Sequence, residues 1–256
     1  MLLNEDETGR YLHRIGLSEI RQPSLAALSE LQLAHLCAVP YENTDILAGK
    51  RLPIEPRDLY EKIVQRHRGG SCLEVNGAFS LLLRSLGYDV TDLLGRFLIY
   101  DAGIPMRRHR VLLVKLEGNR YICDVSIATP APRTPVELLP DIEQHLQYCT
   151  YKYTKDPVLG WVFNEWHESA WRALFSFTED PQLPVDFAAP SFFCEYAPES
   201  RFNKKMMLSI RTPDGRITLE GMSLRFFKGE REFGFERELN DEAERDEILL
   251  KYFGLE

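Results

Sequence analysis

The segment RGGSCLEVN, residues 68–76, places a cysteine at the point where a helix is expected to begin. Gly69 and Gly70 end the preceding helical pattern, and the apolar run after Cys72 is typical of a helix buried on nearly all sides. Unpaired amides and the helix dipole at this end favour an anion, so they would stabilise a thiolate. The two glycines would let a substrate approach the sulfur and leave amides free to bind an oxyanion. The segment therefore suggests a cysteine nucleophile, while a small buried core residue is the competing interpretation.

A thiolate nucleophile usually needs a histidine to hold its proton and an acid to orient that histidine. Among six histidines, His109 stands out because it opens a predicted strand whose neighbour ends in Asp124. An acid at the end of a buried apolar strand requires a polar partner. If the turn pairs Glu117 with Arg120, His109 and Asp124 share a face of the sheet but lie about 13 Å apart along it. A bulge or a different turn register must then bring them together.

The elements that must position these residues change from helices to strands along the chain. Helical spacing of apolar residues predicts helices over residues 7–17, 24–39, 57–68 and 72–86, the last closed by Gly87. Strands are predicted over 89–100, 109–117, 121–127, 145–153 and 159–166, with a connection over the proline-rich residues 181–198. Two hairpins, at 206–221 with an Asp-Gly turn and at 225–238, precede a final helix capped by Asn240.

Composition and charge exclude several classes of function. The 256 residues are long enough for two or three packed subdomains, and 44% of them are hydrophobic and 27% charged, which is ordinary for a globular protein. A net charge of −8 argues against nucleic-acid binding. The N-terminus lacks the order of a signal peptide and no apolar run reaches the length of a spanning helix, so we expect a cytoplasmic protein without a membrane partner. Five irregularly spaced cysteines suggest neither a disulfide framework nor a metal site.

The chain resembles the arylamine N-acetyltransferase family almost from end to end. RGGSCLEVN fits that family's RGGxCxExN nucleophile motif at each fixed position. Similar segments follow the family's order, including YLHRIGL, VPYENTDI, HRVLLV, YICDV, LFSFTEDPQLPVDF, PESRF and TPDGRITL. The resemblance implies an α+β fold with a papain- or transglutaminase-like cysteine core. It implies a helical domain at 1–87 that carries the nucleophile, a β-barrel domain at 88–195 that carries the histidine and aspartate, and an α/β lid at 196–256.

The resemblance also implies a catalytic triad of Cys72, His109 and Asp124. Acetyl-CoA would acetylate Cys72, and an aromatic amine, hydrazine or N-hydroxyarylamine would then take the acetyl group, as in xenobiotic metabolism, with no metal required. His109 would hold and return the proton, while Asp124 fixes the ring tautomer. Arg68, Gly69, Gly70, Glu74 and Asn76 complete the motif. Arg68 and Glu74 are interpreted as supports of the loop, since Glu74 and Asn76 cannot both point into one cleft with Cys72.

One departure from the family pattern concerns the acceptor pocket. The family usually continues its aspartate as DVGFG, whereas this chain has DVSIA, so Ser126, Ile127 and Ala128 stand where two glycines and a phenylalanine are expected. Loss of the aromatic ring removes a stacking surface for arylamines.

Three alternatives therefore stay open. The chain could use another acyl-CoA, it could be an amide synthase that releases an amine-primed polyketide, or it could be a thiol hydrolase that shares the Cys-His-Asp order. Reaction with a longer acyl-CoA would indicate the first alternative. Location of the gene among polyketide synthases would indicate the amide synthase, and release of free acetate would indicate the hydrolase.

Overall fold

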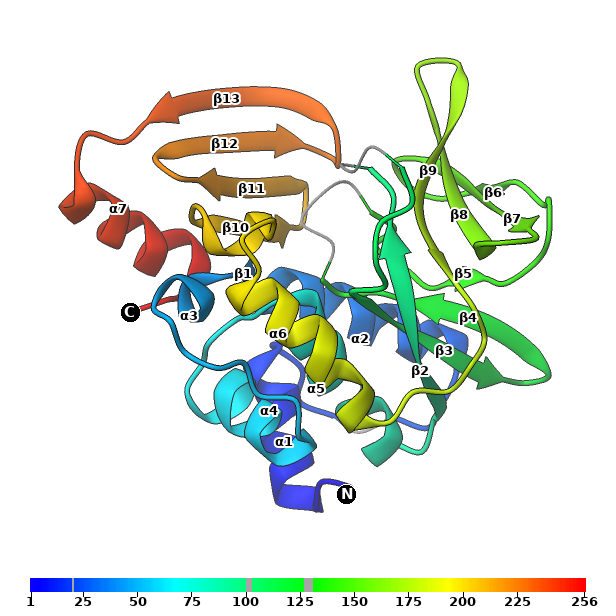
Figure 1. Cartoon of the computed structure of the whole chain (residues 1–256). Coiled ribbons are helices and arrows are strands. Elements are labelled where there is room, and N and C mark those ends of the chain that lie inside the picture. The colour runs from blue at the N-terminus through cyan, green and yellow to red at the C-terminus, as the bar shows by residue number, and fades with distance from the viewer. Residues whose placement is uncertain (20, 100–102, 127–130) are drawn as a thin grey trace.

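The computed structural model describes residues 1–19, 21–99, 103–126 and 131–256. Helices form the first part of the chain, a curved sheet the middle and a smaller sheet with a helix the end (Figure 1). The fold class predicted from the sequence, α+β with a papain-like cysteine core, is confirmed by the structure and its structural neighbours. The predicted domain boundaries at residues 87 and 195 stay predictions.

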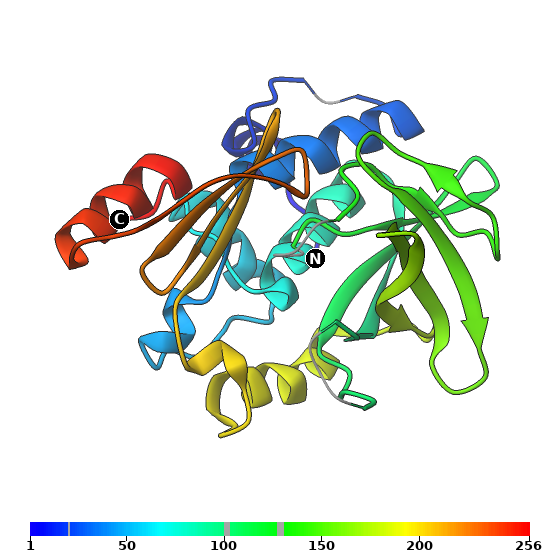
Figure 2. The same cartoon turned by 90° about the horizontal axis from the view of Figure 1, so that it is seen from above.

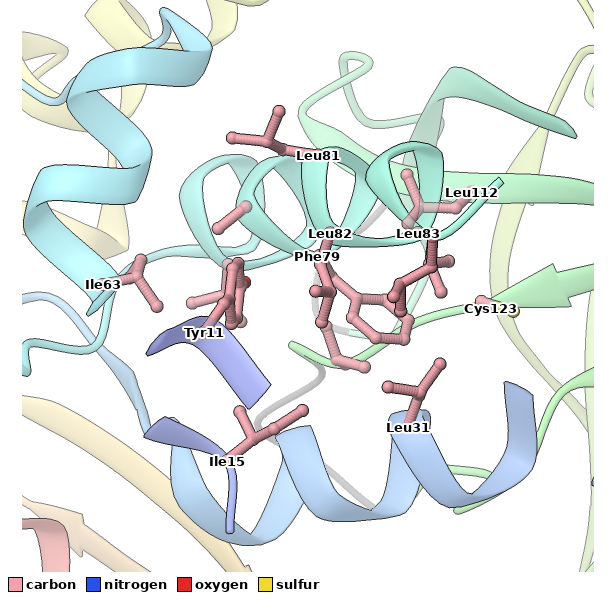
Figure 3. Packing of buried hydrophobic residues seen from close by; sticks show 14 of the residues in the cluster. Tyr11, Ile15, Leu31, Ile63, Phe79, Leu81, Leu82, Leu83, Leu112 and Cys123 are labelled. Carbon is pink, nitrogen blue, oxygen red and sulfur yellow. The ribbon is translucent and has the colours of Figure 1, made fainter. Parts of the chain in front are cut away.

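The N-terminal helices surround one central helix. They are α1 (Glu5–Arg14), α2 (Leu25–Ala38), α3 (Thr44–Leu47), α4 (Pro56–Tyr60) continued by the π-turn η1 (Glu61–Gln65), and α5 (Cys72–Ser85). Every residue of α5 from 73 to 83 is buried. Figure 3 shows apolar side chains of α1, α2 and η1 around this helix, together with Leu112 and Cys123 from the neighbouring sheet. Cys72 therefore begins a helix that is fixed by packing on all sides.

The middle of the chain forms an antiparallel sheet in the order β5-β4-β3-β2-β9-β8-β7-β6. Its strands are β2 (Asp89–Phe97), β3 (His109–Leu116), β4 (Asn119–Cys123), β5 (Val136–Glu137), β6 (Gln144–His145), β7 (Thr150–Asp156), β8 (Gly160–His167) and β9 (Ala170–Phe177). An isolated bridge joins Pro140, between β5 and β6, to Tyr153 in β7, so the sheet is nearly closed into a barrel. Strand β9 was not predicted from the sequence.

The C-terminal sheet has the order β1-β10-β11-β12-β13. Its strands are β1 (Tyr41–Glu42), β10 (Met207–Thr212), β11 (Gly215–Glu220), β12 (Ser223–Lys228) and β13 (Glu232–Glu238), followed by α7 (Glu242–Ile248) and the π-turn η4 (Leu249–Phe253). Helix α2 packs on β10, whereas α5 packs on β2 and β3. Figure 2 shows α5 between this sheet and the barrel. The N-terminal helices thus contact both sheets, α2 the C-terminal sheet and α5 the barrel.

Three local predictions need correction. Residues 181–198 were predicted only as a connection, but they contain η2 (Pro184–Phe187) and helix α6 (Ala188–Tyr196), with η3 (Arg201–Asn203) beyond. The last helix is capped by Asp241 and not by Asn240, because the Asp241 side chain accepts a hydrogen bond from the Glu244 amide. The predicted hairpin of 206–221 is present, but its two turn residues are Pro213 and Asp214, one position earlier than the Asp-Gly pair.

Candidate active site

Cys72 is the first residue of α5 and is partly exposed. The first amides of a helix have no acceptors within the helix, and at α5 the Glu74 and Val75 amides donate to the Ser71 carbonyl. The Sγ atom lies 3.5 Å from the carbonyl oxygen of Arg108, and the Cys72 side chain is close enough to the His109 ring to help raise the pKa of that ring. The cysteine and histidine that the sequence singled out are therefore in contact.

His109 opens β3, and Asp124 directly follows β4. The ring Nε2 lies 2.6 Å from Oδ2 of Asp124, and both side chains are buried. Because Nε2 is engaged by the carboxylate, the other ring nitrogen is the one left to face sulfur. The rings of Phe97 and Phe175 lie 5.6 and 5.3 Å from the His109 ring and enclose it. The imidazole is thus held in one orientation between an acid and a thiol.

The register of the β3–β4 hairpin explains this proximity. Leu116 pairs with Asn119, so the turn is formed by Glu117 and Gly118, whose φ values of 52° and 82° suit a tight hairpin turn. The pairing of Glu117 with Arg120 assumed from the sequence is wrong, because the turn lies one residue earlier and Arg120 pairs with Lys115. In the observed register Leu112 pairs with Cys123, which places Asp124 beside Val111, two positions from His109. The diagonal distance is then short enough for side chains on one face to meet.

The electrostatics of the buried pair favour an imidazolium. Burial lowers the pKa of His109, but the Asp124 carboxylate and the contact with Cys72 outweigh it and raise the pKa to about 10. Burial raises the pKa of Asp124, but His109, Asn76 and the Ser126 amide outweigh it and lower the pKa below its usual value. A protonated ring beside sulfur and an ionised carboxylate behind the ring is the charge arrangement that a thiolate requires.

Asn76 joins this network from one helical turn beyond Cys72. Its Nδ2 atom lies 2.9 Å from Asp124 Oδ1 and 2.6 Å from the Arg110 carbonyl, and its Oδ1 accepts from the Val125 amide. Positions four apart share a helix face, so Cys72 and Asn76 both point towards the start of β3. Asn76 therefore fixes the segment that carries Asp124.

Glu74 points to the opposite side, as the spacing predicted. Its carboxylate accepts from the Ser71 amide at 2.8 Å and from the Lys62 ammonium at 2.6 Å. Lys62 also pairs with Asp45 at 2.7 Å, although only 2% of its side chain is exposed. Burial lowers the pKa of Lys62, but the surrounding carboxylates outweigh it and raise the pKa. This cluster fixes the loop before Cys72 to α3 and η1.

Arg68, Gly69 and Gly70 lie in that loop. Arg68 donates to Glu42 and Thr44, so it holds the loop to β1. A Cβ on Gly69 would lie 2.2 Å from the Pro40 carbonyl oxygen, and one on Gly70 would lie 2.9 Å from the Glu74 carboxylate. The amide of Gly70 donates to the Pro40 carbonyl, so it is not free for an oxyanion as the sequence interpretation assumed. The glycines are required because the neighbouring chain approaches closely.

Of the three residues predicted for the acceptor pocket, the structure describes only Ser126. Ile127 and Ala128 lie outside the described residues. Ser126 is 2% exposed, and its hydroxyl contacts Asn76 and Asp124. A role of these residues in acceptor binding stays a prediction.

Comparison with known proteins places the chain in a family. The family model for N-acetyltransferase matches residues 24–256. The arylamine N-acetyltransferase of Escherichia coli is 30% identical over 247 residues, which cover 96% of this chain and 87% of that protein. The chain belongs to the arylamine N-acetyltransferase family. It is therefore an acyltransferase enzyme by family.

Other members of the arylamine N-acetyltransferase family agree in sequence and fold. The Salmonella typhimurium enzyme named arylamine N-acetyltransferase / N-hydroxyarylamine O-acetyltransferase is 32% identical over 82% of this chain and 75% of its own length. The solved structure of the Salmonella typhimurium enzyme matches with a TM-score of 0.93 and 28% identity over 100% of this chain and 92% of that one. The Mycobacterium marinum enzyme in complex with CoA matches with a TM-score of 0.89 and 31% identity over 98% and 93%.

Sequence reasoning missed two buried charged residues that support the candidate site of this family member. Lys62 could have been suspected because a lysine interrupts the apolar face of residues 59–64. Arg110 lies in the apolar strand β3; it pairs with Asp92 at 2.7 Å and donates to the carbonyl of Leu73 in α5. It therefore connects the barrel to the helix that carries Cys72.

The described residues contain no group of three or more His, Cys, Asp or Glu side chains arranged for a metal ion. No helix among them is long and apolar enough to cross a membrane.

Proposed function

We propose that the chain transfers an acetyl group from acetyl-CoA to an arylamine, hydrazine or N-hydroxyarylamine through an acetyl-Cys72 intermediate. The observation that carries this proposal is the contact of the Cys72 sulfur with a His109 ring that is 2.6 Å from Asp124. Family membership supports acyl transfer, and the CoA complex of the Mycobacterium marinum relative supports CoA as the leaving group.

In the first step the Cys72 thiolate attacks the carbonyl carbon of the thioester. The developing oxyanion would be met by an amide at the start of α5, such as the Cys72 N–H. The new carbon–sulfur bond to Cys72 forms, the bond to the CoA sulfur breaks, and His109 gives its proton to the departing CoA thiolate. One thioester replaces another, so the acetyl group is stored at little energetic cost.

In the second step the amine nitrogen attacks the acetyl carbon. The neutral His109 ring accepts the proton that the nitrogen loses, the bond to Cys72 Sγ breaks, and the sulfur leaves as a thiolate. Asp124 stays ionised throughout and stabilises each imidazolium that forms. The thiolate and imidazolium are then restored for another cycle.

A reducing compartment suits this chemistry, because the nucleophile must be a free thiol. All five cysteines lie in the described residues and are free thiols. We infer that the protein works in the cytoplasm.

Intact-mass spectrometry with acetyl-CoA tests the proposal. We expect the wild type to gain one acetyl group, the Cys72→Ala variant to gain none, and an added arylamine to clear the adduct. The Cys149→Ala variant, which removes another partly exposed cysteine, should still be acetylated. Absence of any adduct would contradict acetyl-CoA as the donor, and loss of the acetyl group as free acetate without amine transfer would indicate a hydrolase.

A further inference from the structure

The hydroxyl of Ser126 lies in the hydrogen-bond network behind His109. Its Oγ is 2.8 Å from Asn76 Nδ2 and 3.1 Å from Asp124 Oδ1, and its backbone amide is 3.0 Å from the same Oδ1. The side chain is only 2% exposed, so water does not compete for these contacts. The serine therefore contacts both the Asp124 carboxylate and the Asn76 amide that also binds it.

A count of donors shows what the hydroxyl adds. The Asn76 amide has two N–H groups but three acceptors around Nδ2, namely the Arg110 carbonyl, Asp124 Oδ1 and Ser126 Oγ. When Ser126 accepts one N–H, its own O–H is free to donate to Asp124. The serine hydroxyl and the serine amide then act on Asp124 Oδ1 in addition to Asn76 Nδ2, while Oδ2 binds the histidine.

We propose that Ser126 is a positioning residue that holds Asp124 ionised and aimed at His109, and that it thereby helps to keep Cys72 reactive. The inference rests on the proposed function only in taking Cys72, His109 and Asp124 as the reacting set. A donor to a carboxylate favours the charged form, and two contacts from one residue restrict rotation of that carboxylate. Asp124 in turn supports the imidazolium that faces sulfur.

The other titratable groups around Asp124 do not change charge in the range that matters. Burial, with a smaller contribution from Asp124, raises the pKa of the Cys123 thiol on β4 well above its usual value. Burial also raises the pKa of Tyr153 on β7, where Cys123 and Asp124 contribute as well. Both groups stay neutral at acidic and neutral pH, so His109 is the titrating group that responds directly to Asp124.

The test measures how fast iodoacetamide alkylates Cys72 as a function of pH, read by intact mass, because only the thiolate reacts. Removal of the hydroxyl in Ser126→Ala makes Asp124 easier to protonate, and a protonated Asp124 no longer supports the imidazolium. We therefore expect the acid-side midpoint of the alkylation profile to rise by about one pH unit. Ser126→Gly, a second variant without the hydroxyl, should shift in the same direction.

Two further variants separate the hydroxyl from general packing. Ser126→Thr retains the hydroxyl and should keep the midpoint near that of the wild type. Ser80→Ala is the matched control, since Ser80 is a buried serine that donates to another carboxylate, that of Asp92, at 3.0 Å. The control should not shift. The proposal is overturned if Ser126→Ala and Ser126→Gly match the wild type, or if Ser126→Thr or Ser80→Ala shifts as much as they do.

Alkylation requires neither CoA nor an acceptor, so this test is independent of the acyl-transfer test. A chain that fails to take an acetyl group but shows the expected shift would contradict the proposed function and support the role of Ser126. Acetylation of Cys72 with no shift in the Ser126 variants would support the proposed function and contradict the role of Ser126.

Discussion

The Nε2 atom of His109 lies 2.6 Å from Oδ2 of Asp124, although the two residues are not paired across the β3–β4 ladder. The contact depends on a two-residue turn at Glu117 and Gly118, which leaves His109 and Asp124 two positions apart on one face. Asn76 from α5 then holds the opposite carboxylate oxygen. The geometry of the acid is therefore fixed by the nearby turn and by a helix that is distant from it in sequence.

Replacement of Asp124 by asparagine should lower acetyl transfer about 10⁴-fold with little change in structure. The amide keeps the shape of the carboxylate but has no negative charge to stabilise an imidazolium. The His109 ring would then be neutral and could adopt the wrong tautomer. Steady-state kinetics with acetyl-CoA and an arylamine measure the effect. Asp141→Asn is the control, because Asp141 is exposed and asparagine tolerates its positive φ of 58°. Equal rates for Asp124→Asn and the wild type would contradict a role for this carboxylate.

Stability should depend on pH through His109. Burial lowers the pKa of His109, but Asp124 and Cys72 raise it to about 10 in the folded chain. Below about pH 6.5 the folded and unfolded rings are both protonated, and the stabilisation from Asp124 is fully present. Between about pH 6.5 and 10 only the folded ring keeps its proton, so the free energy of unfolding falls as pH rises, by at most about 1.4 kcal/mol per pH unit.

Urea unfolding at a series of pH values checks this sign. The His109→Gln variant has no titrating ring, so its free energy of unfolding should depend less on pH over the same window. The difference between wild type and variant is the quantity to plot, because titrating groups that do not interact with His109 cancel in it. A difference that is flat from pH 6.5 to 10, or that rises, would show that the ring is not held protonated.

The sequence allowed α5 and the position of Cys72 to be predicted, because an apolar run between a glycine pair and Gly87 is a strong local signal. The pairing of His109 with Asp124 could only be suspected, since one residue of turn register changes their separation by about 7 Å. The turn residues of both hairpins were predicted one position late. At β10–β11, Pro213 fixes its own φ and starts the turn, while Gly215 is needed because a Cβ there would lie 1.9 Å from the Phe227 carbonyl.

The partners of Lys62 and the helix α6 could not be predicted from the local sequence pattern. Lys62 meets its carboxylate partners only after η1, α3 and α5 have packed together. The helix α6 was missed because prolines flank it, and Pro190 within its first turn is tolerated there. Long-range contacts of this kind follow from tertiary packing and not from periodicity.

The buried ion pairs of Lys62 should be important for stability. Lys62→Met removes the ammonium and leaves Glu74 and Asp45 without it in a buried site, which should lower the free energy of unfolding by about 3–5 kcal/mol. Lys50→Met is the matched control, since Lys50 also pairs with Asp45 but its side chain is 62% exposed. The control should change stability by less than about 1 kcal/mol. Thermal and urea unfolding measure both, and similar losses in the two variants would contradict the prediction.

Gly69 should tolerate no side chain, because the chain of Pro40 and Glu42 approaches it closely. A Cβ at Gly69 would lie 2.2 Å from the Pro40 carbonyl oxygen and 2.8 Å from the Glu42 side chain. Backbone atoms must then move, and Gly69→Ala should cost about 1–3 kcal/mol of stability. Since the loop leads directly into α5, alkylation of Cys72 should also slow.

Gly9→Ala provides the control for this effect in the same chain. Gly9 lies within α1, and a Cβ there would meet nothing within 4 Å, so alanine should stabilise the protein by about 0.5–1 kcal/mol through its higher helix propensity. Unfolding and Cys72 alkylation are measured for both variants. If Gly69→Ala were as stable and as reactive as Gly9→Ala, close approach at Pro40 could not be the reason for a glycine at this position of the motif.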